Sequence, residues 1–173
     1  NNVLQKINIV ENTNNLTDER KLYGIYDPEI NNLDLNIWLN TDGNDIKNIF
    51  QRLNKINLSN SAEELLIDTL MTYSYSPEKN MNEDEFLELK VNWLIKNNKD
   101  ELLEEFLNKN NDFKNKKKVI QYLVDKNIAK ANLNEGCKKT NFISKEIRNS
   151  YLEKFKIYCL IFNDKKSNAQ LLY

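Results

Sequence analysis

The residues with the most chemistry to offer are the two cysteines, Cys137 and Cys159. Each falls on the apolar face of an expected helix, so the pair could form a disulfide that closes a loop of about 22 residues and adds about 3 kcal/mol of stability. A disulfide would favour an oxidising compartment such as a bacterial periplasm or cell envelope. The alternative is two buried thiols that act as small apolar side chains, which would suit the cytoplasm. The sequence leaves both interpretations open.

Most other catalytic chemistry is excluded by what the chain lacks. It contains no histidine, which removes histidine general bases, Ser–His–Asp and Cys–His nucleophile systems, and every zinc site that uses histidine. Its three glycines lie at positions 24, 43 and 136, too far apart for a phosphate-cradling loop or a dinucleotide fingerprint. We therefore expect no catalytic residue, no cofactor and no metal site, and predict that the chain is not an enzyme.

Acidic residues cluster at three places, and each cluster could in principle be catalytic or bind a metal ion. Paired carboxylates are the residues that glycoside hydrolysis uses. Here they fall in the first turns or on the solvated faces of expected helices, where the helix dipole favours acids, and none has the spacing of a calcium loop. We expect structural roles for all three clusters, which are Glu63-Glu64, Glu83-Asp84-Glu85 and Glu104-Glu105.

Basic residues concentrate in one run, residues 114–118, which begins with Lys114 and ends with Lys118; Lys138 and Lys139 follow nearby. Such a run could contact nucleic-acid phosphates. The formal net charge of the chain is −1, however, so no global field attracts a polyanion or an anionic membrane. We interpret the run as a solvated helix start. No apolar stretch approaches the roughly 18 residues that span a bilayer, so membrane insertion is not expected either.

Tyr73 and Tyr75 differ from the other aromatic residues, most of which fall on apolar helix stripes. They lead into a loop at Pro77, which we expect to end the preceding helix. Tyrosine combines an apolar ring with a polar hydroxyl, which suits it to protein interfaces. These two residues are our candidates for an exposed patch that binds a partner protein or peptide.

The elements that position these residues are expected to be helices, because helix-forming residues are abundant and only two prolines interrupt them. Residues 1–40 are expected to form an irregular arm that packs on the helical body through Trp38. Thr41 or Asp42 then caps a helix that runs to about residue 55. Its predicted buried face consists of Ile46, Ile49, Phe50 and Leu53.

Two capping boxes are predicted further along the chain. Ser61 and Glu64 have the spacing of one such box and would start a helix that reaches Pro77. Asn82 and Glu85 have the spacing of the second. From there on, apolar helices are expected to alternate with short polar turns, one of them near residues 125–127.

Three segments of this second half resemble each other: residues 93–99, 122–127 and 159–165. The offsets between their leucines, Leu94, Leu123 and Leu160, are 29 and 37 residues, with an average of 33. Helix-turn-helix repeats have a period of roughly 34 residues. A single hairpin cannot bury its own apolar stripe, so repeated hairpins are expected to stack, and the nearly all-apolar helix that follows residue 150 is expected to be flanked on several sides.

Residues 82–173 resemble the tetratricopeptide-type α-solenoids. In that family a small residue after the turn lets two helices approach closely, and Ala129, Ala131 and Ala169 match such positions. The glycine that usually precedes the turn and the proline at the end of the repeat are missing. The segment is also similar to bacterial, often exported, helical-repeat proteins of unassigned activity. The resemblance implies a scaffold or adaptor role and supplies no catalytic residue.

The sequence thus predicts an all-α fold, a right-handed stack of antiparallel helix hairpins, with an arm at residues 1–40 and a repeat domain at residues 41–173 that continues beyond residue 173. The expected function is non-catalytic: protein–protein interaction or scaffolding. One alternative is a helical superstructure that supports an enzyme active site elsewhere in a longer protein, for example one acting on the cell wall. The other is a nucleic-acid-binding domain that uses the run from Lys114 to Lys118.

Overall fold

The longer helices form where apolar residues recur at three- and four-residue spacing. The computed structural model describes residues 21–110, 113–144 and 147–171. Within these residues the fold is all-α as predicted, since the only β-type pairings are three isolated bridges. The elements are α1 (Gly43–Leu53), α2 (Asn60–Met71), α3 (Glu83–Lys96), α4 (Asp100–Lys109), α5 (Lys116–Ala129), α6 (Leu133–Lys139), the short 3-10 helix η1 (Thr140–Phe142), α7 (Ser150–Phe162) and α8 (Lys166–Gln170).

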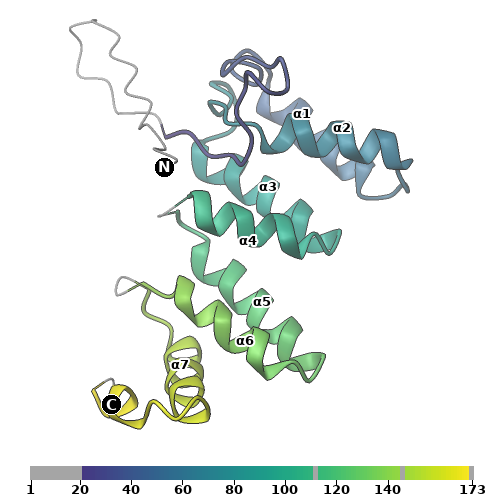
Figure 1. The fold of residues 1–173 in the computed structure, drawn as a ribbon. Helices are drawn as coiled ribbons and strands as arrows, with labels where there is room; N and C mark the ends of the chain where they lie inside the picture. The colour runs from purple at the N-terminus through teal and green to yellow at the C-terminus, as the bar shows by residue number, and fades with distance from the viewer. Residues whose placement is uncertain (1–20, 111–112, 145–146, 172–173) are drawn as a thin grey trace, which may run out of the picture.

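The last six α-helices pack as three successive pairs, α3 with α4, α5 with α6, and α7 with α8. Adjacent pairs also meet, because α5 contacts both α3 and α4, and α7 contacts α6. Figure 1 shows the pairs following one another along the molecule, from the blue end that holds α1 and α2 to the yellow end that holds α7. A lone hairpin would leave its apolar stripe in water.

One turn geometry joins the two helices of each pair. Asn98, Ala131 and Asp164 all have a positive φ of about 55° and lie 33 residues apart in succession. In each turn the next backbone N–H returns to a carbonyl five residues back, at 2.8 to 3.0 Å, as in a Schellman cap. The helices that follow these turns begin at residues 100, 133 and 166, also 33 residues apart.

The predicted register of the middle pair was therefore wrong. Helix α5 does not turn at residues 125–127 but continues to Ala129, and its cap places Asn127, not Leu123, in the position of Leu94. Ala129 and Ala131 are exposed and line no helix contact, so only Ala169 of the three predicted small residues is buried. Gly136 of α6 is buried instead, and a Cβ added to it would lie 3.5 Å from the Phe155 ring of α7.

The first two helices also differ in detail from the prediction. Asp42 does cap α1, by accepting a hydrogen bond from the N–H of Asn44 at 2.8 Å, but Ile49 is 51% exposed. The cap of α2 is Ser59, two residues before the predicted Ser61, and Leu65 is 68% exposed. Helix α2 ends well before Pro77.

The chain leaves α2 at Met71 because the next residues pair with the arm. Thr72 is extended, and the N–H of Tyr73 donates to the carbonyl of Tyr26 at 3.0 Å. Trp38 anchors the later part of the arm, with its ring edge-on to Phe86 at a centroid distance of 5.5 Å. The part of the predicted arm before residue 21 lies outside the described residues.

The last pair is less enclosed than its composition predicted. Helix α7 buries Leu152, Phe155 and Cys159, but it leaves 40 to 49% of Tyr151, Tyr158, Ile161 and Phe162 exposed. Its apolar character therefore does not reflect neighbours on every side. Among the described helices, none is long and apolar enough to cross a membrane.

Candidate functional site

A groove of about 350 Å³ lies between α1 and α3. Its floor is apolar, and the aromatic rings of Phe50 and Trp93 are both nearly fully buried there. Met81 and Leu89 complete that floor. The rim is polar and carries both signs of charge, from Lys47, Gln51, Asn54, Glu85, Glu88, Asn92 and Lys96.

Two polar bridges fix the walls of the groove. Lys47, near the start of α1, donates to Glu85 at the start of α3 at 3.3 Å. Lys96, at the end of α3, donates to the carbonyl of Asn54 after α1 at 2.9 Å. Because the bridges join start to start and end to end, α1 and α3 run in the same direction and the groove lies between two fixed ends.

Local sequence sets the position of Glu85. It closes the predicted capping box of α3: its N–H donates to the Asn82 side chain at 2.9 Å, and its carboxylate accepts the Asn82 N–H at 3.2 Å. This backbone bond and the bond from Lys47 lower the pKa of Glu85. The rim therefore keeps a stable negative charge beside Lys47.

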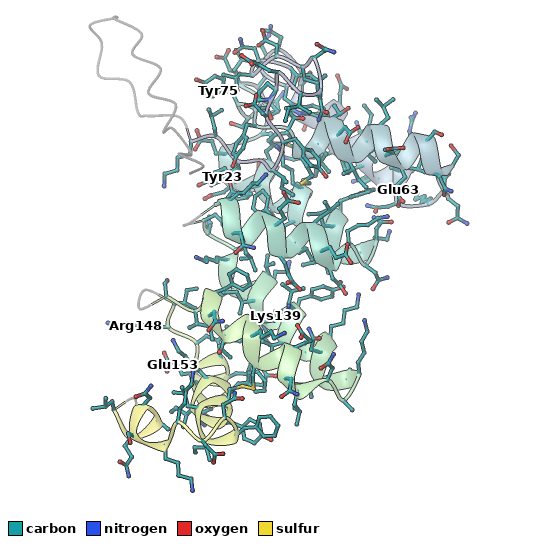
Figure 2. All side chains as sticks on the ribbon, in the orientation of Figure 1. Tyr23, Glu63, Tyr75, Lys139, Arg148 and Glu153 are labelled. Atoms are coloured by element: carbon teal, nitrogen blue, oxygen red, sulfur yellow. A yellow bond between two sulfur atoms is a disulfide. The ribbon has the colours of Figure 1, made fainter. Side chains whose placement is uncertain are left out.

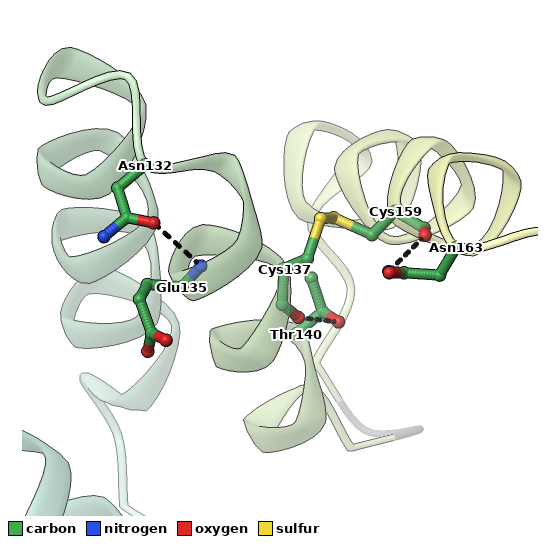
Figure 3. The surroundings of a disulfide bond; sticks show 6 residues. All are labelled: Asn132, Glu135, Cys137, Thr140, Cys159 and Asn163. Carbon is green, nitrogen blue, oxygen red and sulfur yellow. Dashed lines mark hydrogen bonds between the residues drawn. A yellow bond between two sulfur atoms is a disulfide. The ribbon is translucent and has the colours of Figure 1, made fainter.

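The two cysteines meet in a disulfide that joins α6 to α7 (Figure 3). Both are nearly fully buried. Neighbouring polar groups complete the helix ends on either side: the Thr140 hydroxyl donates to the carbonyl of Cys137 at 2.7 Å, and the Asn163 amide donates to that of Cys159 at 2.8 Å. The bond is enclosed by the packing of the two helices and is not part of an open cleft.

Tyr73 and Tyr75 are only partly buried, but they do not stand free on a loop. The arm holds the backbone of both, since Tyr73 bonds to Tyr26 and the N–H of Tyr75 donates to the carbonyl of Leu35 at 2.9 Å. Burial, assisted by the charge of Glu105, raises the pKa of Tyr73. Figure 2 shows Tyr75 and Tyr23 on the left side of the upper part of the molecule and Glu63 on its right side.

The basic run at the start of α5 is engaged with the acids of α3. Lys114 pairs with Asp84 at 2.8 Å, and this hydrogen bond raises the pKa of the lysine. Lys118 lies 3.6 Å from Glu88 and donates to Asn92 at 2.9 Å. Both ends of the run thus hold α5 against α3, which lowers the positive charge that they could offer to phosphate.

The other acidic clusters serve the same structural purpose. Glu63 pairs with Lys99 at 2.6 Å, and Glu104 pairs at 2.6 Å with Lys139, a lysine that is itself nearly buried between α4 and α6. Within the described part of the chain, no group of carboxylates and cysteines has the arrangement of a metal site.

Sequence reasoning missed Lys90, which is 1% exposed in the middle of α3. Its ammonium donates to the carbonyl of Tyr23 at 3.2 Å and to the Ser74 hydroxyl at 3.4 Å, and it lies 4.7 Å from the centre of the Phe86 ring. Burial lowers its pKa to about 7. Its position was the available signal, because Phe86, Lys90 and Leu94 follow the four-residue spacing of a buried face.

Comparisons with known proteins identify no relative: no family model matches the chain, and neither a curated protein nor a solved structure shows a significant similarity to it. The groove, the disulfide and the arm therefore have to be interpreted from their own geometry.

Proposed function

We propose that this chain is a non-catalytic stack of helix hairpins, similar to the tetratricopeptide-type solenoids, that binds another polypeptide in the groove between α1 and α3. The observation that carries the proposal is the groove itself: an apolar floor with Phe50 and Trp93, framed by charges of both signs and held open between two polar bridges. Peptide-binding sites combine apolar pockets with a polar rim in this way.

The solenoid interpretation is supported by contacts that recur at the 33-residue spacing. Lys118 of α5 donates to Asn92 of α3, and Tyr151 of α7 donates to Asp125 of α5 at 2.5 Å. Each residue of the second contact lies 33 positions after its counterpart in the first. The same helix face is therefore used to join one pair to the next, as in repeat proteins whose units contact mainly their neighbours.

A polypeptide fits the groove better than a nucleic acid does. The rim carries Glu85 and Glu88 as well as Lys47 and Lys96, so a strand of phosphates would meet carboxylates beside the lysines. A peptide can present an apolar side chain to the floor and charges of either sign to the rim. Lys114 and Lys118 are paired with carboxylates, which also favours a polypeptide over a nucleic acid as the ligand.

Trp93 provides a direct test in the full chain. Trp38→Phe leaves Trp93 as the only tryptophan, and it removes no hydrogen bond among the described residues because the Trp38 indole N–H is buried without a partner. Peptides selected from a displayed random library are titrated into this variant. We expect saturable changes in Trp93 fluorescence, with dissociation constants that worsen at least about tenfold when Gln51→Phe fills the groove.

Asn48→Phe is the matched control, because Asn48 is exposed on the same helix but does not line the groove. It should leave the dissociation constants unchanged. Failure to select any peptide that perturbs Trp93, or equal losses in the two variants, would exclude the groove as the binding site.

The disulfide further supports an oxidising compartment for the protein, such as a periplasm or cell envelope, since thiols are kept reduced in the cytosol. Thiol labelling of the natural protein under denaturing, non-reducing conditions tests this. Unlabelled Cys137 and Cys159 are expected. Complete labelling before any reductant is added would place the protein in a reducing compartment.

A further inference from the structure

Residues 23–26 of the arm lie extended against the body, and their carbonyls are met by side chains from two different helices. Lys90 of α3 donates to the carbonyl of Tyr23 at 3.2 Å. At the end of α4, Asn110 donates to the carbonyl of Gly24 at 2.9 Å, and Lys109 donates to that of Ile25 at 2.6 Å. Three successive peptide carbonyls are thus bound by side chains, in addition to the isolated bridges that Tyr23 and Tyr26 form with Ser74 and Thr72.

The remaining backbone groups of the segment are bonded as well. The Gly24 N–H donates to the Asn110 side-chain oxygen at 3.4 Å, so this one amide both donates to and accepts from the same glycine. The N–H groups of Ile25 and Tyr26 donate to the carbonyl of Met71 at 2.6 and 3.1 Å. Every backbone polar group from the Tyr23 carbonyl to the Tyr26 carbonyl therefore has a partner on the body.

The polar side chains that contact residues 23–26 are arranged to bind the backbone of a peptide. Lys90 and Asn110 are 1% and 5% exposed, and the hydrogen bonds of Lys90 go to the arm and to one hydroxyl, with no carboxylate among them. A buried polar side chain without a partner costs about 1 to 3 kcal/mol. Without an extended segment in this place, Lys90 would lose its bond to Tyr23, and Asn110 would lose both of its bonds to Gly24.

We propose that Lys90, Lys109, Asn110 and the backbone of residues 71–73 form a binding site for an extended polypeptide, that residues 23–26 fill it as a tethered ligand, and that a segment of a partner polypeptide takes their place when the arm leaves. This site lies apart from the groove between α1 and α3 and goes beyond the function proposed for that groove.

Residues 23–26 of the arm show which residue types the partner segment must contain. Glycine is required at its centre, because a Cβ on Gly24 would lie 2.5 Å from the backbone nitrogen of Tyr73. The next side chain, Ile25, is 1% exposed, and the Tyr23 ring lies edge-on to Phe113 at 6.5 Å. The expected ligand is a glycine between two bulky apolar residues, recognised mainly through its backbone.

The tether determines how the site is tested. A segment attached by a short linker has an effective concentration in the millimolar range, so a free peptide competes poorly with the arm of the natural chain. Gly24→Ala in the full chain prevents the arm from docking but alters no residue of the receptor side. A labelled peptide with the sequence of residues 21–28 is then titrated into the natural chain and into this variant.

We expect the peptide to bind the Gly24→Ala chain at least about tenfold more tightly than the natural chain. A peptide in which alanine replaces the glycine should bind at least about tenfold more weakly, and Asn110→Ala added to the variant should weaken binding by about 10- to 100-fold. A peptide with phenylalanine and valine in place of the tyrosine and isoleucine that flank the glycine should bind within about tenfold of the original.

A second protein, a cleavable form of the natural chain, serves as a control for unfolding caused by the Gly24→Ala substitution. A protease recognition sequence inserted after Ile30, which is 76% exposed, allows the arm to be cut from a folded full-length chain and diluted away before peptides are added. If neither protein binds the peptide while its helical circular dichroism is retained, the site is only an internal packing contact. Equal binding of the glycine and alanine peptides would also overturn the proposal.

Discussion

Lys90 is a cation whose surroundings favour its neutral form. Burial lowers its pKa to about 7, whereas the unfolded chain binds a proton at this lysine up to its ordinary value near 10.5. Between those values the unfolded state holds more protons than the native state, so the free energy of unfolding rises with pH. Below about pH 7 both states are protonated, and the penalty for the buried charge is present in full.

Lys90→Met should remove this pH dependence. The natural chain is expected to gain stability from pH 7 to pH 9 with a slope of up to about 1.4 kcal/mol per pH unit, and the variant should have a flatter profile. Urea denaturation at several pH values measures it, and the range stops at pH 9 because burial also raises the pKa of Tyr26 and Tyr73. Lys117→Met is the control on an exposed lysine and should keep the natural slope. A natural chain whose stability is constant over this range would contradict the argument.

An added methyl group should lower the free energy of unfolding strongly at Gly24 but change it little at Gly136. A Cβ on Gly24 would meet the backbone of Tyr73 at 2.5 Å, whereas one on Gly136 would lie 3.5 Å from its nearest neighbours. Gly24→Ala should therefore lower the free energy of unfolding by about 3 kcal/mol. The loss cannot exceed the free energy with which the arm docks, because the arm can detach instead of accommodating the added methyl group. Gly136→Ala should change it by less than about 1 kcal/mol and favour α6 through helix propensity. Urea midpoints compare the two, and equal effects would refute the steric explanation.

At the scale of single helices, a different serine caps α2 from the one that the sequence predicted. The Ser59 hydroxyl accepts the N–H of Ala62 at 3.3 Å, while Ser61 lies within the first turn and is exposed. Ser59→Ala should cost about 1 kcal/mol through the lost cap. Ser61→Ala should change stability by only a few tenths of a kcal/mol, because alanine has the higher helix propensity. Thermal unfolding of both variants distinguishes them, and the reverse order would place the cap at Ser61.

Periodicity was enough to predict helices but not their register. The Asp125-Lys126-Asn127 stretch looks like the turns at residues 97–99 and 163–165, yet it lies within α5, and the actual turn is made by Ala131 in a conformation that alanine seldom adopts. The turn at Ala131 keeps the 33-residue spacing from the turns at Asn98 and Asp164, which residues 125–127 do not. Local sequence carries no sign of it.

The candidate sites were harder to predict than the helices for the same reason. The groove combines residues of α1 and α3 that lie about 40 positions apart, and the arm meets Asn110 across 86 positions. For the cysteine pair the sequence left a disulfide and two buried thiols as alternatives, because both residues fall on apolar helix faces, and the structure has the disulfide. Tyr73 was predicted to be exposed since nothing local indicates that the arm covers its backbone.

For the molecule as a whole, successive junctions between pairs use different bonds at related positions. Lys126 of α5 binds Asp100 of α4 at 2.7 Å and the Tyr122 hydroxyl at 3.1 Å. Cys159 of α7 lies 33 residues after Lys126 and bonds covalently to Cys137 of α6. The pair of α7 and α8, in which much of α7 is exposed, is thus the one that a covalent bond holds to the preceding pair.

Reduction of the disulfide should therefore release the last pair before the rest of the stack opens. In arrays whose units contact mainly their neighbours, the terminal unit can open separately, and a disulfide closing 22 residues is worth about 2 to 4 kcal/mol. Native-state hydrogen exchange should show amides of α7 and α8 exchanging about 30- to 1000-fold faster after reduction, while those of α3 and α4 change little. A Cys137→Ser, Cys159→Ser double variant should exchange fast with or without reductant. Equal acceleration in all helices would mean that the molecule opens as one unit and that the stack has no separable end.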